Sequence, residues 1–327
     1  MTAFDKLAHT IDQQLGLLRQ RGLVIPDEAR TRHYLASISY YRLSAYTRPF
    51  YVPRQPDHSF LPGTTFDQVL ALYIFDRELR LLLLDAIERI EVALRAQMTN
   101  TLAEHHGAHG YTNCGIFDDR YNHAWLMDKL GKEVESRDAE SFVEHYRNKY
   151  GAAPKQPPVW MAMELLTFKE VSRLFGALRH NQDTQRISQH FGWPDTVLRS
   201  WFRNLSDLRN LCAHHARVWN REFGSFPLIP RKPPRGWAQI PPGVVVGQQE
   251  QQAQIEPQRR FYMQWVVIES LMRVVCPESE WSKRLLHLLD QHPHISRRHM
   301  GFPDDWTQQA FWQLVVAPVA TPLGVRQ

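Results

Sequence analysis

Cysteine is scarce in this sequence, and long apolar runs are missing. The 327 residues contain three cysteines, which are far apart and form no CxxC pair: Cys114, Cys212 and Cys276. This spacing argues against a disulfide framework and against a cysteine-rich zinc site, so we expect reduced thiols. The strongest apolar run, residues 81–84, is far shorter than the roughly 20 residues of a membrane span, and the N-terminus lacks the features of a signal peptide. We therefore expect a soluble, cytoplasmic protein.

Strand-forming patterns are also scarce. The one convincing β-branched run is Val244, Val245 and Val246, whereas apolar residues recur at helical spacing through most of the chain. The sequence therefore predicts an all-α fold. Hydrophobic residues make up 43% and charged residues 22%, which excludes wholesale disorder and allows a substantial core. The formal net charge of +5 permits a polyanionic partner without requiring one.

Apolar periodicity and capping signals locate the expected helices. Thr65 and Gln68 have the spacing of a capping box and Gly107 is a stop signal, so we expect one long helix between them. Other helices are expected over residues 4–22, 26–46, 123–149 (as one helix or two), 159–178, 183–191, 196–221, 258–275 and 279–291. Residues 227–257, rich in proline and glutamine, are expected to form a loop. The tail is expected to dock through Trp306, Phe311 and Trp312.

The densest polar cluster of the chain lies at residues 207–221. On a helical wheel, one set of side chains shares an apolar face: Leu205, Leu208, Cys212, His215 and Trp219. A second set falls on the opposite, polar face: Asp207, Asn210, His214 and Arg217. Arg209 lies at the border between the two faces. We therefore expect His215 to be a packed core histidine and His214 to lie on an electropositive stripe.

Four segments resemble those of a known family. In chain order they are SYYRLS at 39–44, FDRELRLLLLDAIERIEVALR at 75–95, LRNLCAHHARVWN at 208–220 and MGFPDDW at 300–306. Together they resemble the Abi-like (abortive infection, AbiD/AbiF type) phage-resistance family of bacteria, over nearly the whole chain. Within the third segment, Arg209 and His214 resemble the RxxxxH signature of HEPN-fold ribonucleases.

The resemblance implies a HEPN-like helical bundle at residues 61–226, preceded by an N-terminal helical region at 1–60. The 227–257 loop then joins this core to C-terminal helices and a tail at 258–327, which pack on it. The resemblance further implies a homodimer whose two RxxxxH helices meet in a composite site that cuts RNA without a metal. The implied role is that of a toxin in phage defence, restrained by a small-RNA or protein antitoxin.

The chemistry of metal-free RNA cleavage suits the residue types in this cluster. The ribose 2′-OH attacks the adjacent phosphorus, which needs a group that titrates near neutrality and a cation that meets the charge of the phosphorane. His214 is the candidate acid–base residue, Arg209 the candidate clamp, and Asn210 a residue that orients the imidazole or the phosphate. Arg217 and Arg221 are candidates for binding flanking phosphates. One copy offers one histidine on this face, so a two-fold pair of helices supplies both a base and an acid.

Tyr41 and Arg42 belong to an aromatic and basic cluster at residues 39–46. Aromatic rings stack bases and arginines contact phosphates in proteins that bind single-stranded RNA, so both residues are candidates for RNA binding. The alternative is that the tyrosines pack their helix against the body of the protein. Both interpretations are open on the sequence.

Two other groups invite a metal or acid–base interpretation. Glu91 and Arg95 are four residues apart on the long helix, where an intrahelical ion pair is commoner than a carboxylate site shared with Glu88. His105 and His106 lack the i,i+4 spacing of a helical metal pair and have no acidic partner close in sequence. We therefore predict no metal site and no cofactor.

Three functions are compatible with these observations. We favour an endoribonuclease of the HEPN type. The alternatives are a helical module that binds RNA or regulates without cutting it, and a purely structural dimerisation protein. Catalysis predicts a severe phenotype for His214→Ala and a mild one for Arg217→Ala, whereas phosphate binding alone predicts the reverse.

Overall fold

The computed structural model describes residues 7–150, 154–240, 244–246 and 253–316. Its regular secondary structure is almost wholly helical, which confirms the all-α prediction. The helices are α1 (Ile11–Gln20), α2 (Glu28–Ile38), α3 (Tyr40–Thr47), α4 (Phe66–His106), α5 (His123–Glu135), α6 (Ser141–Tyr150), α7 (Val159–Ala162), α8 (Phe168–Ala177), α9 (Asn181–Phe191), α10 (Asp195–Ala213), α11 (Phe261–Val275), α12 (Trp281–Gln291) and α13 (Gln313–Val316). Within the described residues, one antiparallel strand pair departs from this pattern: β1 (Val244–Val246) and β2 (Ala253–Ile255).

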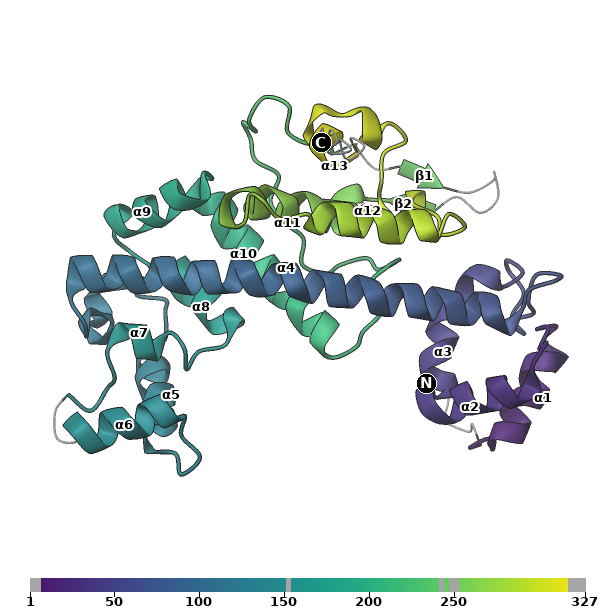
Figure 1. The fold of residues 1–327 in the computed structure, drawn as a ribbon, viewed down its shortest axis with the longest axis horizontal. Coiled ribbons are helices and arrows are strands. Elements are labelled where there is room, and N and C mark those ends of the chain that lie inside the picture. Colours follow the sequence, from purple (N-terminus) through teal and green to yellow (C-terminus); the bar gives the residue numbers. More distant parts are fainter. Residues whose placement is uncertain (1–6, 151–153, 241–243, 247–252, 317–327) are drawn as a thin grey trace, which may run out of the picture.

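A single long helix, α4, forms the axis of the molecule. It begins with the predicted capping box of Thr65 and Gln68, in which each side chain accepts from the backbone N–H of the other residue. It ends, also as predicted, at Gly107, whose φ of 77° costs glycine no strain. Its 41 residues correspond to a length of about 60 Å. In Figure 1, α11 and α12 lie along this helix, α1 to α3 lie near one of its ends, and α5 to α7 lie near the other.

The hydrophobic core follows α4 and joins all of these regions. Buried residues form one cluster that extends from Leu15 in α1 to Val315 in α13. α10 packs against α8 and α4, and α11 packs against α4 with every residue from 261 to 268 buried. The tail docks as predicted, with these aromatic residues buried: Trp306, Phe311 and Trp312. The core therefore connects the N-terminal helices, the long axis and the C-terminal helices in one body.

Two of the predicted helices are interrupted. The helix expected over residues 26–46 breaks at Ser39, whose φ of 73° ends α2 and whose hydroxyl caps the start of α3. The helix expected over 159–178 splits into α7 and α8 because Thr167 and Glu170 form a capping box at the start of α8. In both cases a side-chain cap competes with continuation of the apolar periodicity.

Two further helices are shorter than predicted. The helix expected over residues 4–22 begins at Ile11, behind a capping box of Thr10 and Gln13; residues 1–6 lie outside the described residues. The helix expected over 196–221 ends at Ala213. The 123–149 segment forms two helices, α5 and α6.

The remaining predictions concern loops and single side chains. Residues 227–240 are irregular, as expected, whereas 241–243 and 247–252 lie outside the described residues. The three cysteines are free, as expected: Cys114, Cys212 and Cys276. No helix in the described part of the chain combines the length and the apolar character needed to cross a bilayer.

Candidate functional site

The candidate site begins where α10 ends. The N–H of His215 donates to the carbonyl of Cys212 at 3.0 Å, and the N–H of Ala216 donates to that of Leu211 at 2.9 Å. These two bonds form a Schellman motif, which needs a left-handed residue at its penultimate position. His215 occupies this position with a φ of 57°, where glycine is the usual residue. The chain therefore leaves the helix at His214, and the helical wheel does not apply beyond Ala213.

This ending changes the places of the two histidines. His214 caps α10 and is exposed, as the polar-face prediction required. His215 is also exposed, so the prediction that it packs in the core is wrong. The other members of the expected apolar face are buried: Leu205, Leu208, Cys212 and Trp219. Burial raises the pKa of the Cys212 thiol to about 12, which leaves no thiolate at neutral pH.

A buried carboxylate holds the segment that follows the helix. Asp76 of α4 is fully buried and accepts from the backbone N–H of Val218 at 3.0 Å and from that of Trp219 at 2.7 Å. Its other oxygen accepts from the Tyr46 hydroxyl at 2.6 Å and pairs with the Arg80 guanidinium. Because these two N–H groups bond to a side chain, they are not available for helical bonds. This is the physical reason that α10 stops short of Arg221.

The charge of the buried Asp76 carboxylate is balanced by the neighbouring guanidinium of Arg80. Burial raises the pKa of the Asp76 carboxyl, and the hydrogen bond from Tyr46 and the charge of Arg80 act in the opposite direction. All four contacts are donors, so the ionised carboxylate satisfies every one of them. Burial and the charge of Asp76 raise the pKa of the Tyr46 phenol, which therefore remains a donor. We infer that Asp76 and Arg80 form a structural ion pair beneath the surface.

A pocket of about 600 Å³ lies between α3 and residues 214–221, and we call it the α3 pocket. Its lining includes five residues predicted from the sequence: Tyr41, Arg42, His214, Arg217 and Arg221. His215 and Arg48 also line it. Among the described residues of the lining, four are arginines and none is acidic. The α3 pocket is therefore electropositive and suited to anionic ligands.

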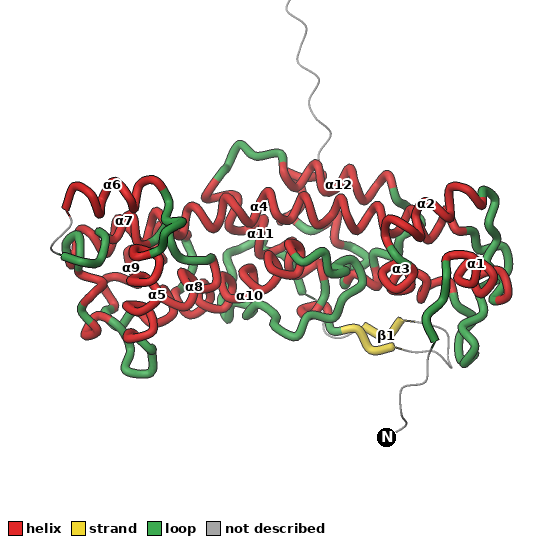
Figure 2. The backbone as a smooth tube through the Cα atoms, turned by 90° about the horizontal axis from the view of Figure 1, so that it is seen from below, coloured by secondary structure: helices red, strands yellow, loops and turns green. Residues whose placement is uncertain are grey.

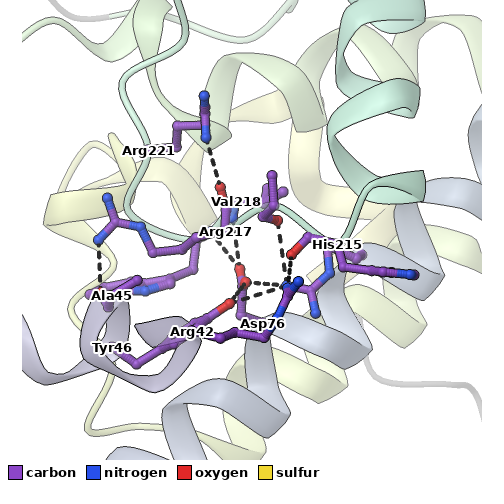
Figure 3. A network of polar contacts seen from close by, with 11 residues as sticks. Arg42, Ala45, Tyr46, Asp76, His215, Arg217, Val218 and Arg221 are labelled. Carbon is purple, nitrogen blue, oxygen red and sulfur yellow. Dashed lines mark hydrogen bonds and ion pairs between the residues drawn. The ribbon is translucent and has the colours of Figure 1, made fainter. Parts of the chain in front are cut away.

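The arginines of the α3 pocket cross-link its two walls, as Figure 3 shows. Arg42 donates to the carbonyl of His215 at 2.7 Å, and Arg217 donates to that of Ala45 at 3.2 Å. Arg221 donates to the carbonyl of Arg217 at 3.5 Å. Burial lowers the pKa of the Arg217 guanidinium, which nonetheless stays cationic at neutral pH. These bonds fix the pocket shape and leave further guanidinium donors for a ligand.

Two predicted site residues lie outside the α3 pocket. Arg209 is exposed on α10, and its guanidinium approaches the side-chain oxygen of the half-buried Asn210 at 3.5 Å. Neither residue lines the pocket that contains His214. Within one chain, His214 therefore lines the same pocket as Arg42, Arg217 and Arg221. Arg209 does not line that pocket.

The tyrosines at residues 39–46 differ in whether packing or RNA binding describes them better. Tyr46 is buried and Tyr40 is half-buried, so packing describes both of them. Tyr41 has 89% of its surface exposed and lines the α3 pocket, where its ring is available for stacking. The role of Tyr41 in RNA binding stays a prediction.

The buried pair of Asp76 and Arg80, which holds the segment after α10, was not predicted from the sequence. Asp76 and Arg80 are four residues apart on α4, among apolar residues of the same face such as Leu72, Leu79 and Leu83. A charged pair at helical spacing inside an apolar stripe is a signal of a buried ion pair, and it was present in the sequence. What the pair binds could not be read from the sequence.

The two groups considered for metal binding have structural partners. Glu91 and Arg95 form the predicted intrahelical ion pair. His105 and His106 both bond to the buried carboxylate of Asp183 in α9, at 2.6 and 2.8 Å. Across the residues that the structure describes, no group of three or more His, Cys, Asp or Glu side chains is arranged to hold a metal ion.

Comparison with known proteins identifies a family for this chain. No curated protein and no solved structure matches the chain. A family model described as Abi-like protein matches residues 33–220, which is more than half of the chain. This interval contains α3, the buried pair of Asp76 and Arg80, α10 and every residue of the α3 pocket except Arg221. The chain therefore belongs to the Abi-like protein family.

Proposed function

We propose that this protein is a metal-independent endoribonuclease of the HEPN type that acts as a toxin or abortive-infection effector in phage defence. Membership of the Abi-like family supports the general role, abortive infection. One observation carries the enzymatic part of the proposal: the exposed His214 lines a pocket that contains four arginines. This combination supports the proposal, because histidine can transfer protons near neutral pH and arginines bind phosphates.

The proposed reaction is transesterification within the RNA strand. The ribose 2′-oxygen forms a bond to the adjacent phosphorus while a base removes its proton, and the bond from phosphorus to the 5′-oxygen breaks. The leaving 5′-oxygen takes up a proton from an acid, so the products are a 2′,3′-cyclic phosphate and a 5′-hydroxyl. His214 is the proposed proton-transfer residue, Arg209 meets the charge of the phosphorane, and Asn210 orients one of the reacting groups.

The α3 pocket is the proposed binding surface for the strand around the cleaved bond. Its guanidinium groups from Arg42, Arg217 and Arg221 suit flanking phosphates, and the exposed ring of Tyr41 suits stacking of a base. No carboxylate is present among the described lining residues, so a phosphate meets no like charge there. This arrangement also supports the proposal of an RNA substrate over a cationic or neutral one.

A second copy of the chain completes the proposed site. Arg209 and His214 carry the RxxxxH pattern, yet Arg209 does not line the pocket of its own chain. In a two-fold dimer, the exposed end of α10 in one copy faces that of the other, and each supplies an arginine and a histidine. The exposure of His215 offers an alternative within one chain, in which the adjacent histidines provide base and acid.

The decisive experiment follows RNA cleavage by purified protein in the presence of EDTA. We expect products with 2′,3′-cyclic phosphate ends from the wild type and from His215→Ala, and no products from His214→Ala. Undiminished cutting by His214→Ala, or a requirement for added metal, would refute the proposal. Loss of cutting in both histidine variants would instead favour the pair of histidines within one chain.

The dimer has its own test. If the site is composite, specific activity falls on dilution below the dissociation constant of the dimer, and an excess of His214→Ala protein inhibits the wild type. Activity that is independent of concentration, with no inhibition by the variant, would show that one chain suffices.

A structural or RNA-binding role without cleavage is the second candidate. It is favoured by the bonds of Arg42 and Arg217 to carbonyls of their own chain, which tie α3 to the segment after α10. On this interpretation Arg217→Ala is severe and His214→Ala is mild. The proposed ribonuclease predicts the opposite order, so the same two variants separate the candidates.

A further inference from the structure

A second basic pocket lies on α10, toward its N-terminal half. It has a volume of about 610 Å³ and is formed by α8, α10 and residues 225–226; we call it the α8 pocket. Four cationic side chains line it against one carboxylate, Asp207: Lys169, Arg173, Arg199 and Arg203. Their excess of positive charge indicates an anionic ligand.

Two of the four cations have no anionic partner. Lys169 pairs with Asp207 at 3.6 Å, and Arg199 pairs with Asp195 at 3.3 Å and donates to the carbonyl of Leu178. Arg173 and Arg203 are exposed, and their guanidinium groups make no hydrogen bond or ion pair with any described residue. The free donors therefore come from both walls of the pocket, one from α8 and one from α10.

The α8 pocket lies along the face of α10 that precedes His214. At about 100° per residue, positions 199, 203 and 210 fall within a sector of roughly 40°. His214 follows at the end of the helix, where its N–H donates to the carbonyl of Asn210 at 2.9 Å. Arg203 and His214 are 11 positions apart in the sequence, which corresponds to about 16 Å along the helix axis. Figure 2 shows α8, α10 and α3 in that order along the molecule. The α8 pocket uses residues 199–207 of α10, whereas the α3 pocket begins at His214, where the helix ends.

We propose that the α8 pocket binds backbone phosphates of the RNA strand whose cleavage site lies at His214. Arg173 and Arg203 would each neutralise a phosphate. The ring of Phe226 at the edge of the pocket is covered by the guanidinium of Arg259, 4.4 Å from its centroid, which adds a further positive charge there. This inference rests on the proposed function for the identity of the ligand. Free inorganic phosphate carries the same kind of negative charge as the RNA backbone, so binding of the two has to be measured separately.

The test uses the double variant Arg173→Gln, Arg203→Gln in a His214→Ala background, so that binding is measured without cleavage. A labelled single-stranded RNA is titrated at several salt concentrations. We expect weaker binding, and a decrease of about 1.4 in the slope of log affinity against log salt, because two phosphate contacts are lost from a single strand. Both side chains are exposed and unpaired, so thermal unfolding should not change.

The matched control removes two other arginines. Arg137 and Arg235 are exposed, line neither pocket and have the same charge, so Arg137→Gln, Arg235→Gln should leave the slope almost unchanged. An equal loss of affinity in this control would overturn the inference, because net charge alone would explain it. An unchanged RNA slope in the Arg173/Arg203 variant would also overturn it, even if inorganic phosphate stabilised the parent but not the variant.

Failure of this inference can be told from failure of the proposed function. If the wild type does not cut RNA but the Arg173/Arg203 variant loses affinity and slope, the α8 pocket binds RNA and the nuclease proposal fails. If the wild type cuts RNA and the variant in the active background binds and cuts like the wild type, the nuclease proposal survives and the α8 pocket has no part in it.

Discussion

The α3 pocket and the α8 pocket are both basic and both border α10, but they are built differently. The α8 pocket stands on two regular helices and presents two unpaired arginines, Arg173 and Arg203. The α3 pocket stands on irregular backbone after α10, which Asp76 and Arg80 hold from beneath. Only the α3 pocket contains histidine among its described lining residues. The comparison teaches that basic side chains can be presented on the surface of a regular helix, whereas the position of His214, the proposed proton-transfer residue, depends on the buried pair of Asp76 and Arg80.

The hydrogen bonds to Asp76 explain why both His214 and His215 are exposed. A helix continued to Arg221 would turn His215 toward the core, as the apolar periodicity predicted. Asp76 instead takes the N–H groups of Val218 and Trp219, so the chain turns at His215 and both imidazoles reach the surface. A buried charge pair is weak evidence for stability, but it is well suited to selecting one backbone path.

The largest expected effect comes from Asp76→Ala. It leaves Arg80 buried without its partner and frees two backbone N–H groups, so we expect the free energy of unfolding to fall by about 3–5 kcal/mol. Asp207→Ala in the α8 pocket breaks a half-exposed pair and should cost less than about 1 kcal/mol. Denaturant unfolding of both variants measures the contrast. Similar, small losses in the two would show that the pockets are not built differently.

The next largest effect concerns His214→Ala. We expect the cleavage rate to fall by about 10²–10⁴-fold, the usual contribution of an acid–base residue, while RNA affinity stays close to that of the wild type. The Arg173/Arg203 variant should show the opposite pattern, with weaker binding and a retained rate at saturating RNA. Single-turnover kinetics give both quantities. A loss of affinity without a loss of rate in His214→Ala would remove the chemical distinction between the pockets.

A smaller effect distinguishes the structural role of the His215 backbone from a chemical role of its imidazole. Its left-handed φ of 57° is strained for histidine, so His215→Gly should stabilise the turn by roughly 1 kcal/mol relative to His215→Ala, which retains a Cβ. If His215 serves only as the turn, both variants cut RNA like the wild type. If its imidazole transfers a proton, both lose activity whatever their stability. Cleavage assays and thermal unfolding of the pair decide between the two.

The smallest expected effect is a pH dependence of stability that arises from two histidines outside both pockets. Burial lowers the pKa of His299, with the charge of Arg260 adding to it, and burial also lowers the pKa of His292. As the pH falls through about 6.5, these histidines bind protons in the unfolded chain before they do so in the folded protein. Acidification therefore lowers the free energy of unfolding, and this decrease is complete once the pH lies below the folded pKa values. Neither histidine lines the α3 pocket or the α8 pocket.

Denaturant midpoints at neutral and mildly acidic pH measure this dependence. The variant His292→Gln, His299→Gln should flatten it, whereas the Arg173/Arg203 variant should keep it. A stability that rises on acidification would contradict the lowered pKa values.

The sequence alone determined the structural features that join residues within one or two helical turns of each other. The capping box of Thr65 with Gln68, the stop at Gly107 and the ion pair of Glu91 with Arg95 all formed as predicted, because each joins residues at most four positions apart or depends on one residue. The all-α class followed from the same short-range periodicity. These local signals need no knowledge of the remaining chain.

Tertiary structure alone decided the site. Asp76 is 142 positions from Val218, and Asp183 is 78 positions from His105, so no spacing rule could connect either pair. At residues 214–221 the apolar periodicity favoured a helix, but two bonds to a fully buried carboxylate outweighed it. A buried acceptor must be satisfied wherever the fold places it, and only the folded chain reveals which N–H groups are within its reach.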